Sequence, residues 1–346
     1  MPEARRIPFW SDNIECACPE VMEAVVAANS GAAPSYGSDS WSAVLQQKVS
    51  DIFETDVTVF PVVTGTASNA LALSALTPPY GKIFCHAFAH IHTDECSAPE
   101  LFTGGAKLSA LQGENAKIGA ADLASAIRGG GNVHNAQPWT VSITQATEGG
   151  TVYRLGEIQA IAEVCRTNGL KLHMDGARFA NGLVSLGSTP AEMTWKAGVD
   201  VLSLGGTKNG CLAAEAIVFF DRRLAQDFCY LQKRAGQLLS KMRFVSAQLD
   251  AYLTDELWLR NARQANAMAS RLSAGLAALP AAELVYPTEA NEVFVRLPRS
   301  AVEALESAGV AVNDGELDGS AARFVTTWNT QPDDVDALLA AIAGQR

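Results

Sequence analysis

The stretch Leu170-Lys-Leu-His-Met-Asp-Gly-Ala-Arg178 contains a short β-rich run that ends on an acidic residue and is followed by a glycine. We predict a strand over residues 170–174, with Asp175 at its carboxyl end. In open α/β sheets, ligands bind outside the carboxyl ends of the strands, where the loops converge on a crevice. Asp175 is therefore a candidate binding residue, although an aspartate before Gly-Ala is also typical of an ordinary helix N-cap.

A second run, residues 199–204, leads directly into Gly205-Gly-Thr-Lys-Asn-Gly210. Only one βα crossover separates the two runs, and because such crossovers are right-handed, we expect parallel strands that bring Asp175 and Lys208 to one edge. This pair suits pyridoxal phosphate, since a lysine amine forms the Schiff base and an aspartate keeps the pyridine nitrogen protonated. For Lys208 alone, an exposed loop position is the commoner fate.

Outward from these two runs, short β-rich segments alternate with helical stretches between residues 57 and 220, which predicts a mostly parallel sheet with helices on both faces. The sequence then becomes strongly helical to about residue 279 and ends in a smaller α/β pattern. We therefore expect a large cofactor-binding domain at 12–250 and a small domain at 251–346, with segment 1–11 packing near the site. The remaining predicted strands are 57–63, 82–85, 141–144, 216–220, 292–297 and 323–326.

The composition of the 346-residue chain favours a small-molecule enzyme. Hydrophobic residues make up 48% and charged residues 18%, as in a soluble globular protein, and the formal net charge is −11. Such a charge gives no basic surface for nucleic acid or for an anionic membrane. No segment has the pattern of a signal peptide or a membrane span, so we expect a cytoplasmic protein that binds neither nucleic acid nor membrane.

The segment Val59-Phe-Pro-Val-Val-Thr-Gly-Thr-Ala-Ser-Asn69 is a candidate phosphate site, because it predicts a strand, a glycine turn and then the start of a helix. The backbone N–H groups of Gly65, Thr66 and Ala67 would lie at a helix N-terminus, which attracts anions. The same Thr-Gly-Thr sequence also makes an ordinary helix cap.

Histidines are concentrated at His86, His90 and His92. A metal site is one interpretation, but no carboxylate or thiolate cluster with recognised spacing lies nearby. An imidazole also stacks well on a flat heteroaromatic ring. We predict no metal site here.

Taken together, these motifs resemble the low-specificity L-threonine aldolases, including their phenylserine-cleaving relatives, and their order and spacing fit over nearly the whole chain. The resemblance implies an aspartate-aminotransferase-like (fold type I) pyridoxal-phosphate fold and a carbon–carbon lyase that forms glycine and an aldehyde. The motifs that carry it are Thr64-Gly-Thr-Ala, Ala89-His90, His173-Met-Asp-Gly-Ala-Arg, Gly205-Gly-Thr-Lys-Asn-Gly, Trp10-Ser-Asp-Asn, Ser35-Tyr-Gly-Ser-Asp, Gln145-Ala-Thr-Glu-Gly, Ser240-Lys-Met-Arg and Ala322-Arg-Phe-Val-Thr.

The resemblance also implies residue roles. Lys208 would form the Schiff base, Asp175 would pair with the pyridine nitrogen, and His90 would stack on the ring as a further catalytic residue. The phosphate would be held by Gly65, Thr66 and Ala67, and the substrate carboxylate by Ser11, Arg178 and Arg323, with Arg178 also beside the cofactor.

Members of this family are usually homotetramers whose sites are shared between subunits, so Tyr36 would reach the substrate and Arg243 the cofactor across an interface. Without the resemblance, Tyr36 would be interpreted as an aromatic residue in a loop turn and Arg243 as a solvent-exposed helix residue. Thr147 stands where many members carry a second histidine, and a threonine cannot act as a base with a near-neutral pKa. With Thr147 as the substrate contact, we expect modest discrimination between L-threonine and L-allo-threonine.

Two questions stay open at this stage. The proton acceptor for the β-hydroxyl group is His90, an ordered water or the cofactor phosphate. The alternative functions are a β-eliminating lyase or aminotransferase of the same fold, which would share Lys208 and Asp175, and a non-catalytic cofactor-binding module.

Overall fold

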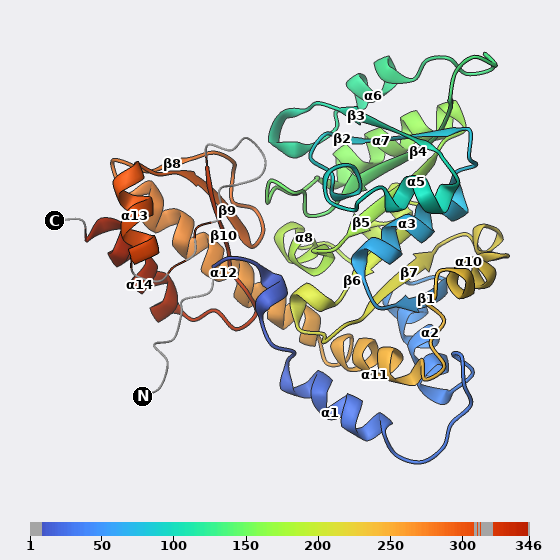
Figure 1. The fold of residues 1–346 in the computed structure, drawn as a ribbon, viewed down its shortest axis with the longest axis horizontal. Helices are drawn as coiled ribbons and strands as arrows, with labels where there is room; N and C mark the ends of the chain where they lie inside the picture. The colour runs from blue at the N-terminus through green and yellow to red at the C-terminus, as the bar shows by residue number, and fades with distance from the viewer. Residues whose placement is uncertain (1–8, 308–309, 311, 313–320, 345–346) are drawn as a thin grey trace.

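The computed structural model describes residues 9–307, 310, 312 and 321–344. The described chain forms a large and a small lobe, each built on its own sheet (Figure 1). The large sheet has the order β1-β7-β6-β5-β4-β2-β3 and the small sheet the order β10-β9-β8. The strands are β1 (Thr58–Val62), β2 (Gly81–His86), β3 (Lys107–Leu111), β4 (Gln137–Thr144), β5 (Lys171–Gly176), β6 (Val201–Gly205), β7 (Glu215–Phe219), β8 (Glu283–Leu284), β9 (Glu292–Arg296) and β10 (Ala322–Val325).

The large sheet is mostly parallel, as predicted. Strands β3, β2, β4, β5 and β6 pair in parallel, and only β7 runs antiparallel to its two neighbours, β6 and β1. Every strand predicted from the sequence is present within a few residues. Strand β3 was missed because it lies at the edge of the sheet with side chains exposed or half-buried, so its sequence has no continuous apolar run.

Helices cover both faces of the large sheet, because successive side chains along each strand point to opposite sides. On β6, Val201 packs with residues of α3 and α10, whereas Leu202 packs with residues of α2, α7, α8 and α11. The helices are α1 (Pro19–Ala28), α2 (Ser40–Ile52), α3 (Gly65–Leu76), α4 (His90–Thr93), α5 (Ala98–Thr103), α6 (Ala120–Ala126), α7 (Leu155–Asn168), α8 (Phe179–Leu186), α9 (Pro190–Met193), α10 (Phe228–Arg234), α11 (Arg243–Tyr252), α12 (Leu257–Ala277), α13 (Arg299–Ser307) and α14 (Pro332–Ala343).

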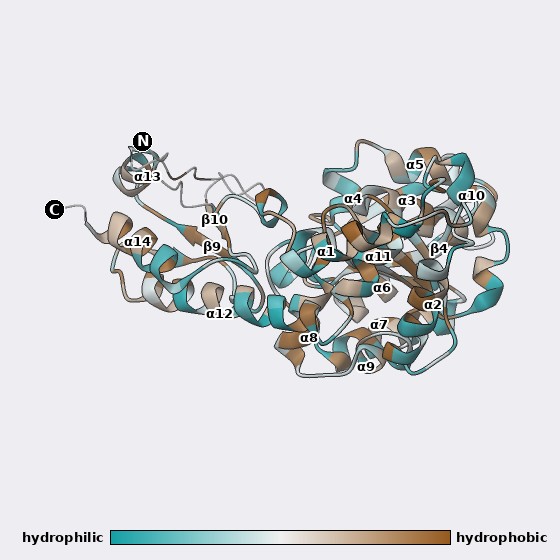
Figure 2. Ribbon diagram, turned by 90° about the horizontal axis from the view of Figure 1, so that it is seen from below, coloured by the Kyte–Doolittle hydropathy of each residue, from teal (hydrophilic) through white to brown (hydrophobic). Residues whose placement is uncertain are grey.

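The small lobe has its own apolar core between its sheet and helices α12, α13 and α14. In Figure 2 the strands β9 and β10 are brown, while α12 turns a largely teal surface outward. Helix α12 joins the lobes, since Trp258 near its start belongs to the large core and Leu272 to the small one. The expected domain boundary at 250/251 lies in the last turn of α11, directly before this connecting helix.

Part of the N-terminal segment also belongs to the small lobe. Phe9 is buried against Phe324 with its ring edge-on at 6.4 Å, and its carbonyl accepts a hydrogen bond from the Val325 N–H. Residues 1–8 of this segment lie outside the described range. Among the helices that the structure describes, none is long and apolar enough to cross a membrane.

Candidate active site

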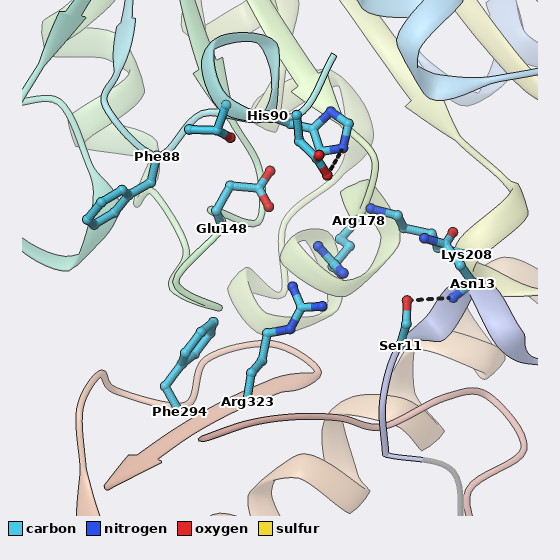
Figure 3. A pocket seen from close by; sticks show the side chains of 11 residues that line it. Ser11, Asn13, Phe88, His90, Glu148, Arg178, Lys208, Phe294 and Arg323 are labelled. Carbon is cyan, nitrogen blue, oxygen red and sulfur yellow. Dashed lines mark hydrogen bonds and ion pairs between the residues drawn. The ribbon is translucent and has the colours of Figure 1, made fainter. Parts of the chain in front are cut away.

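Two adjacent cavities lie at the carboxyl edge of the parallel strands. The inner cavity, about 280 Å³, is lined by the large lobe and Asn13, and the outer cavity, about 350 Å³, lies between the two lobes (Figure 3). Their walls share Asn13, His90, Glu148 and Lys208. A ligand that fills both would therefore contact the same four residues at the junction.

Asp175 and Lys208 both line the inner cavity, as the crossover argument predicted. Strands β5 and β6 are parallel neighbours, and Lys208 lies in a short 3₁₀ turn that follows β6. Asp175 is 3% exposed and accepts hydrogen bonds from the Ala177 N–H (3.0 Å) and from the Asn69 amide (2.8 Å). It is not the helix N-cap, because α8 begins after Arg178.

The N-terminus of α3 forms another wall of the inner cavity. Gly65 and Thr66 line it, and as first-turn residues their N–H groups have no partner within the helix. A Cβ on Gly65 would meet no atom within 4 Å, so the glycine borders open space. Ala67 does not line the cavity, and its N–H donates to the Thr64 hydroxyl at 3.1 Å, which makes it an ordinary capping contact.

A chain of hydrogen bonds connects His90 with Asp175. His90 Nδ1 lies 2.8 Å from Glu95 Oε1, and the Asn69 amide donates to that same oxygen and to Asp175, each at 2.8 Å. The hydrogen bond to Glu95 raises the pKa of His90 above its usual range, and burial raises the pKa of Glu95. The network therefore holds the side chains of His90 and Asp175 in fixed positions.

The other two histidines of the cluster do not join His90. The ring of His86 is held by the Gly113 carbonyl and the Phe88 N–H, and burial lowers its pKa, whereas His92 is exposed. Among the described residues, no group of three or more histidine, cysteine or acidic side chains is arranged to hold a metal ion.

The two arginines predicted for the substrate carboxylate differ in their partners, although both line the outer cavity. Arg178 is buried, and its Nε and Nη2 donate to the two Asp12 oxygens at 2.8 and 3.1 Å while Nη1 lies 3.2 Å from Glu292. Arg323 Nη1 lies 3.8 Å from Glu292, and its buried Nε has no hydrogen-bond partner among the described residues. Arg323 therefore has donors to offer, whereas the guanidinium of Arg178 is occupied.

Burial of Glu292 raises its pKa to about 7, against the opposing charges of Arg178 and Arg323. Burial also raises the pKa of Asp12, but Arg178 and Lys208 outweigh this effect and hold it below the usual range. The group beneath the outer cavity is thus a packed arrangement of buried acids and arginines.

The loop after β4 places Thr147 and Glu148 in different surroundings. Thr147 is 1% exposed, and its hydroxyl lies 2.8 Å from the Thr151 hydroxyl and accepts the Thr151 N–H. It lines neither cavity, so its contact with the substrate stays a prediction that the geometry of the ligand-free chain does not support. The next residue, Glu148, lines both cavities. Side-chain direction in this loop is set by the turn that Thr147 stabilises, which the linear sequence does not reveal.

Comparison with known proteins places this arrangement in a family. A family model described as "Beta-eliminating lyase" matches residues 8–299. A low specificity L-threonine aldolase from Pseudomonas sp. (strain NCIMB 10558) is 46% identical over 334 residues, covering 96% of each chain. The chain belongs to the low-specificity L-threonine aldolase family. The sequence resemblance is thereby confirmed, as is the predicted class of enzyme, a carbon–carbon lyase.

Solved structures of other proteins superpose on this chain over nearly its whole length. A threonine aldolase from Leishmania major superposes with a TM-score of 0.90 at 26% identity, over 97% of this chain and 98% of that one. An aspartate aminotransferase from Thermus thermophilus superposes with a TM-score of 0.71 at 16% identity, over 96% and 89% of the two chains, which is a likeness of fold alone. The predicted aspartate-aminotransferase-like fold is confirmed.

The remaining predicted site residues of this aldolase-family chain fall in two groups. Ser11 lines the outer cavity and its hydroxyl accepts the Asn13 N–H at 3.1 Å. Tyr36 and Arg243 line neither cavity within one chain: the Tyr36 ring is 49% exposed beneath Lys233, and Arg243 donates to a backbone carbonyl. Their roles across an interface stay predictions.

Sequence reasoning missed several groups that the fold brings to the site. Glu148 follows a parallel strand of the sheet, so the argument applied to Asp175 would have found it. Asn69 and Glu95 carried no such signal, because their partners lie on other elements. Glu215, which also lines the inner cavity, begins the antiparallel strand β7 and accepts the Gly206 N–H at 2.9 Å.

Proposed function

We propose that this chain is a pyridoxal-phosphate-dependent aldolase that cleaves L-threonine, L-allo-threonine and related β-hydroxy-α-amino acids, such as L-phenylserine, to glycine and an aldehyde. The observation that carries the proposal is the convergence of Lys208, Asp175 and His90 on one cavity that continues into a second one beside Arg323. The 46% identical relative named as a low specificity L-threonine aldolase supports the choice of substrate.

The inner cavity fits pyridoxal phosphate by the chemistry of its walls. Lys208 supplies the amine for a covalent link, Asp175 a carboxylate for the pyridine nitrogen, and His90 a flat ring to stack on the cofactor. The free N–H groups of Gly65 and Thr66 at the start of α3 suit the phosphate. Ala67 is left out of this proposal because its N–H already has a partner.

In the reaction, bound pyridoxal phosphate supplies an electron sink for the pair left on Cα when the Cα–Cβ bond breaks. Asp175 stabilises the protonated ring nitrogen, and the Asn69 hydrogen bond holds its carboxylate in place. Arg323 binds the substrate carboxylate through its unpartnered donors, with Ser11 nearby. Lys208, at the junction of the two cavities, carries the proton that completes glycine at Cα.

The outer cavity also suggests why side chains of different size would be accepted. Phe88 and Phe294 stand opposite Lys208 and leave apolar surface toward the space between the lobes (Figure 3). An apolar wall discriminates weakly between a methyl and a larger group, because each methylene contributes only about 1–3 kcal/mol.

We also propose a domain division, an oligomeric state and a cellular location for the protein. The two separate cores support a large and a small domain, proposed at 12–250 and 251–346, although the start of α12, with Trp258, still packs in the large core. Segment 1–11 reaches the site through Ser11. We further propose a cytoplasmic homotetramer in which Tyr36 and Arg243 of one subunit complete the site of another, because both side chains lie away from their own cavities. The small-molecule amino acid is its only proposed partner besides its own copies.

The test uses the purified enzyme with pyridoxal phosphate. Visible absorption before and after glycine addition should change, and L-threonine should give equal amounts of acetaldehyde and glycine, while Lys208→Ala gives neither. Release of ammonia and a keto acid would instead identify a β-eliminating lyase, and formation of a keto acid with transfer of the amino group would identify an aminotransferase. Absence of a spectral change would leave only a non-catalytic module.

A further inference from the structure

Glu148 stands out in the loop that follows β4. From Thr140 to Tyr153, it is the one residue that is not buried, and its side chain borders both cavities. The loop around it is fixed, because the Thr147 hydroxyl accepts the Thr151 N–H and the Thr151 hydroxyl donates to the Asn115 carbonyl at 2.6 Å. The fold therefore presents this single carboxylate to the cavities from a rigid support.

The carboxylate of Glu148 has no hydrogen bond or ion pair with any residue that the structure describes. The neighbouring acids differ in this respect: Asp12 and Glu292 are paired with arginine, and Asp175 and Glu95 each accept the Asn69 amide. Each of these four carboxylates is therefore held by at least one arginine or amide of the protein. Among these acids of the described chain, Glu148 is the one that has neither a hydrogen bond nor an ion pair, and it borders both cavities.

Its position relative to the other groups decides which part of a ligand it would meet. In Figure 3 the Glu148 carboxylate points into the space between His90 above and Arg323 below, across the cavity from Lys208. A substrate whose amine lies at Lys208 and whose carboxylate lies at Arg323 directs its β-carbon to the remaining side. That side is the one occupied by Glu148.

We propose that Glu148 is the catalytic residue that removes the proton from the substrate's β-hydroxyl group. This inference rests on the proposed function and names a residue for the step that sequence reasoning left between His90, a water and the cofactor phosphate. His90 is the weaker candidate, because its Nδ1 is already engaged by Glu95 at 2.8 Å and its ring is the one proposed to stack on the cofactor.

The step balances without a further reagent. The O–H bond breaks and its proton goes to the Glu148 carboxylate, while its electron pair forms the C=O bond of the aldehyde. The Cα–Cβ bond breaks and its electron pair remains with the amino-acid fragment. One proton is then added at Cα, which gives glycine.

Glu148→Gln removes the charge and keeps the size of the side chain, and Glu163→Gln on the exposed surface of α7 is the matched control. We expect kcat for L-threonine cleavage to fall by about 100-fold or more in Glu148→Gln, the usual contribution of a general base. Exchange of the glycine Cα proton in D₂O and the dissociation constant of glycine should not change, because glycine has no β-hydroxyl. The control should behave as wild type.

A readout independent of turnover is the pKa of His90, followed by NMR in the cofactor-free protein and assigned with His90→Asn. The negative charge of Glu148 raises this pKa, so Glu148→Gln should lower it. The inference is overturned if cleavage is unaffected, if only KM rises, if cleavage and glycine exchange fall together, or if the pKa of His90 does not move. A wild-type enzyme that releases no acetaldehyde from L-threonine would instead refute the proposed function.

Discussion

Replacing Arg178 and Arg323 by leucine, one at a time, should give two different defects, although both arginines line the outer cavity. Arg178→Leu would leave Asp12 and Glu292 buried without their cation. Breaking a buried pair in this way costs about 3–5 kcal/mol of unfolding free energy. With an unfolding entropy of about 2.1 cal/mol/K per residue, that loss lowers the thermal midpoint of a chain of this length by roughly 4–7 °C.

Arg323→Leu removes a guanidinium whose Nε has no partner and whose Nη1 makes only a long ion pair, 3.8 Å, with Glu292. Stability should therefore fall less than in Arg178→Leu. Loss of charge-assisted hydrogen bonds to the substrate carboxylate costs about 2–3 kcal/mol, which raises KM for L-threonine by roughly 30- to 150-fold.

The assay combines thermal unfolding of the cofactor-free proteins with steady-state cleavage of L-threonine. Arg271→Leu is the control, because this exposed arginine pairs with Asp336 on the surface, where such pairs contribute about 0–1 kcal/mol. If Arg178→Leu unfolds at the wild-type temperature and raises KM more than Arg323→Leu does, then Arg178 is the carboxylate receptor and the reasoning from hydrogen-bond partners fails.

The other predictions concern the inner cavity and the sheet beneath it. Borohydride reduction of the loaded enzyme should attach the cofactor to the peptide that contains Lys208, and Lys208→Ala should retain no covalent cofactor; a label on another peptide would remove Lys208 from the site. Asp175→Asn should lower kcat by at least about 100-fold. It should also cost about 1–3 kcal/mol of unfolding free energy, because the amide has one acceptor oxygen for the two donors Ala177 N–H and Asn69. Near-normal turnover would leave Asp175 only a structural role. Burial lowers the pKa of His173 from 6.5 to about 4. As the pH falls, the histidine of the unfolded chain therefore takes up a proton at a higher pH than that of the folded protein does. The unfolding free energy should fall by roughly 3 kcal/mol between pH 6.5 and pH 4. His173→Gln should lose that component of the pH dependence in urea titrations, and an unchanged profile would contradict the assignment.

The sequence by itself determined the features that depend on local order along the chain. Apolar β-rich runs predicted the strands of the large sheet except the edge strand β3, and a single crossover between the two key strands was enough to bring Asp175 and Lys208 to one edge. The glycine turn before α3 predicted a helix N-terminus, which now borders the inner cavity at Gly65 and Thr66. These inferences succeed because strand direction and crossover handedness follow from backbone sterics rather than from distant contacts.

Only the tertiary structure decided which side chains are free to act. Arg178 is occupied by Asp12, a partner 166 positions away, whereas Arg323 keeps a donor without a partner, and the two look alike in sequence. Thr147 turns inward and Glu148 turns to the cavities because one turn orients the loop. Hydrogen-bond partners in a folded protein come from whichever elements the packing brings together, and each donor used in holding the fold is lost to the ligand. That competition depends on three-dimensional contacts, which the linear order of residues does not specify.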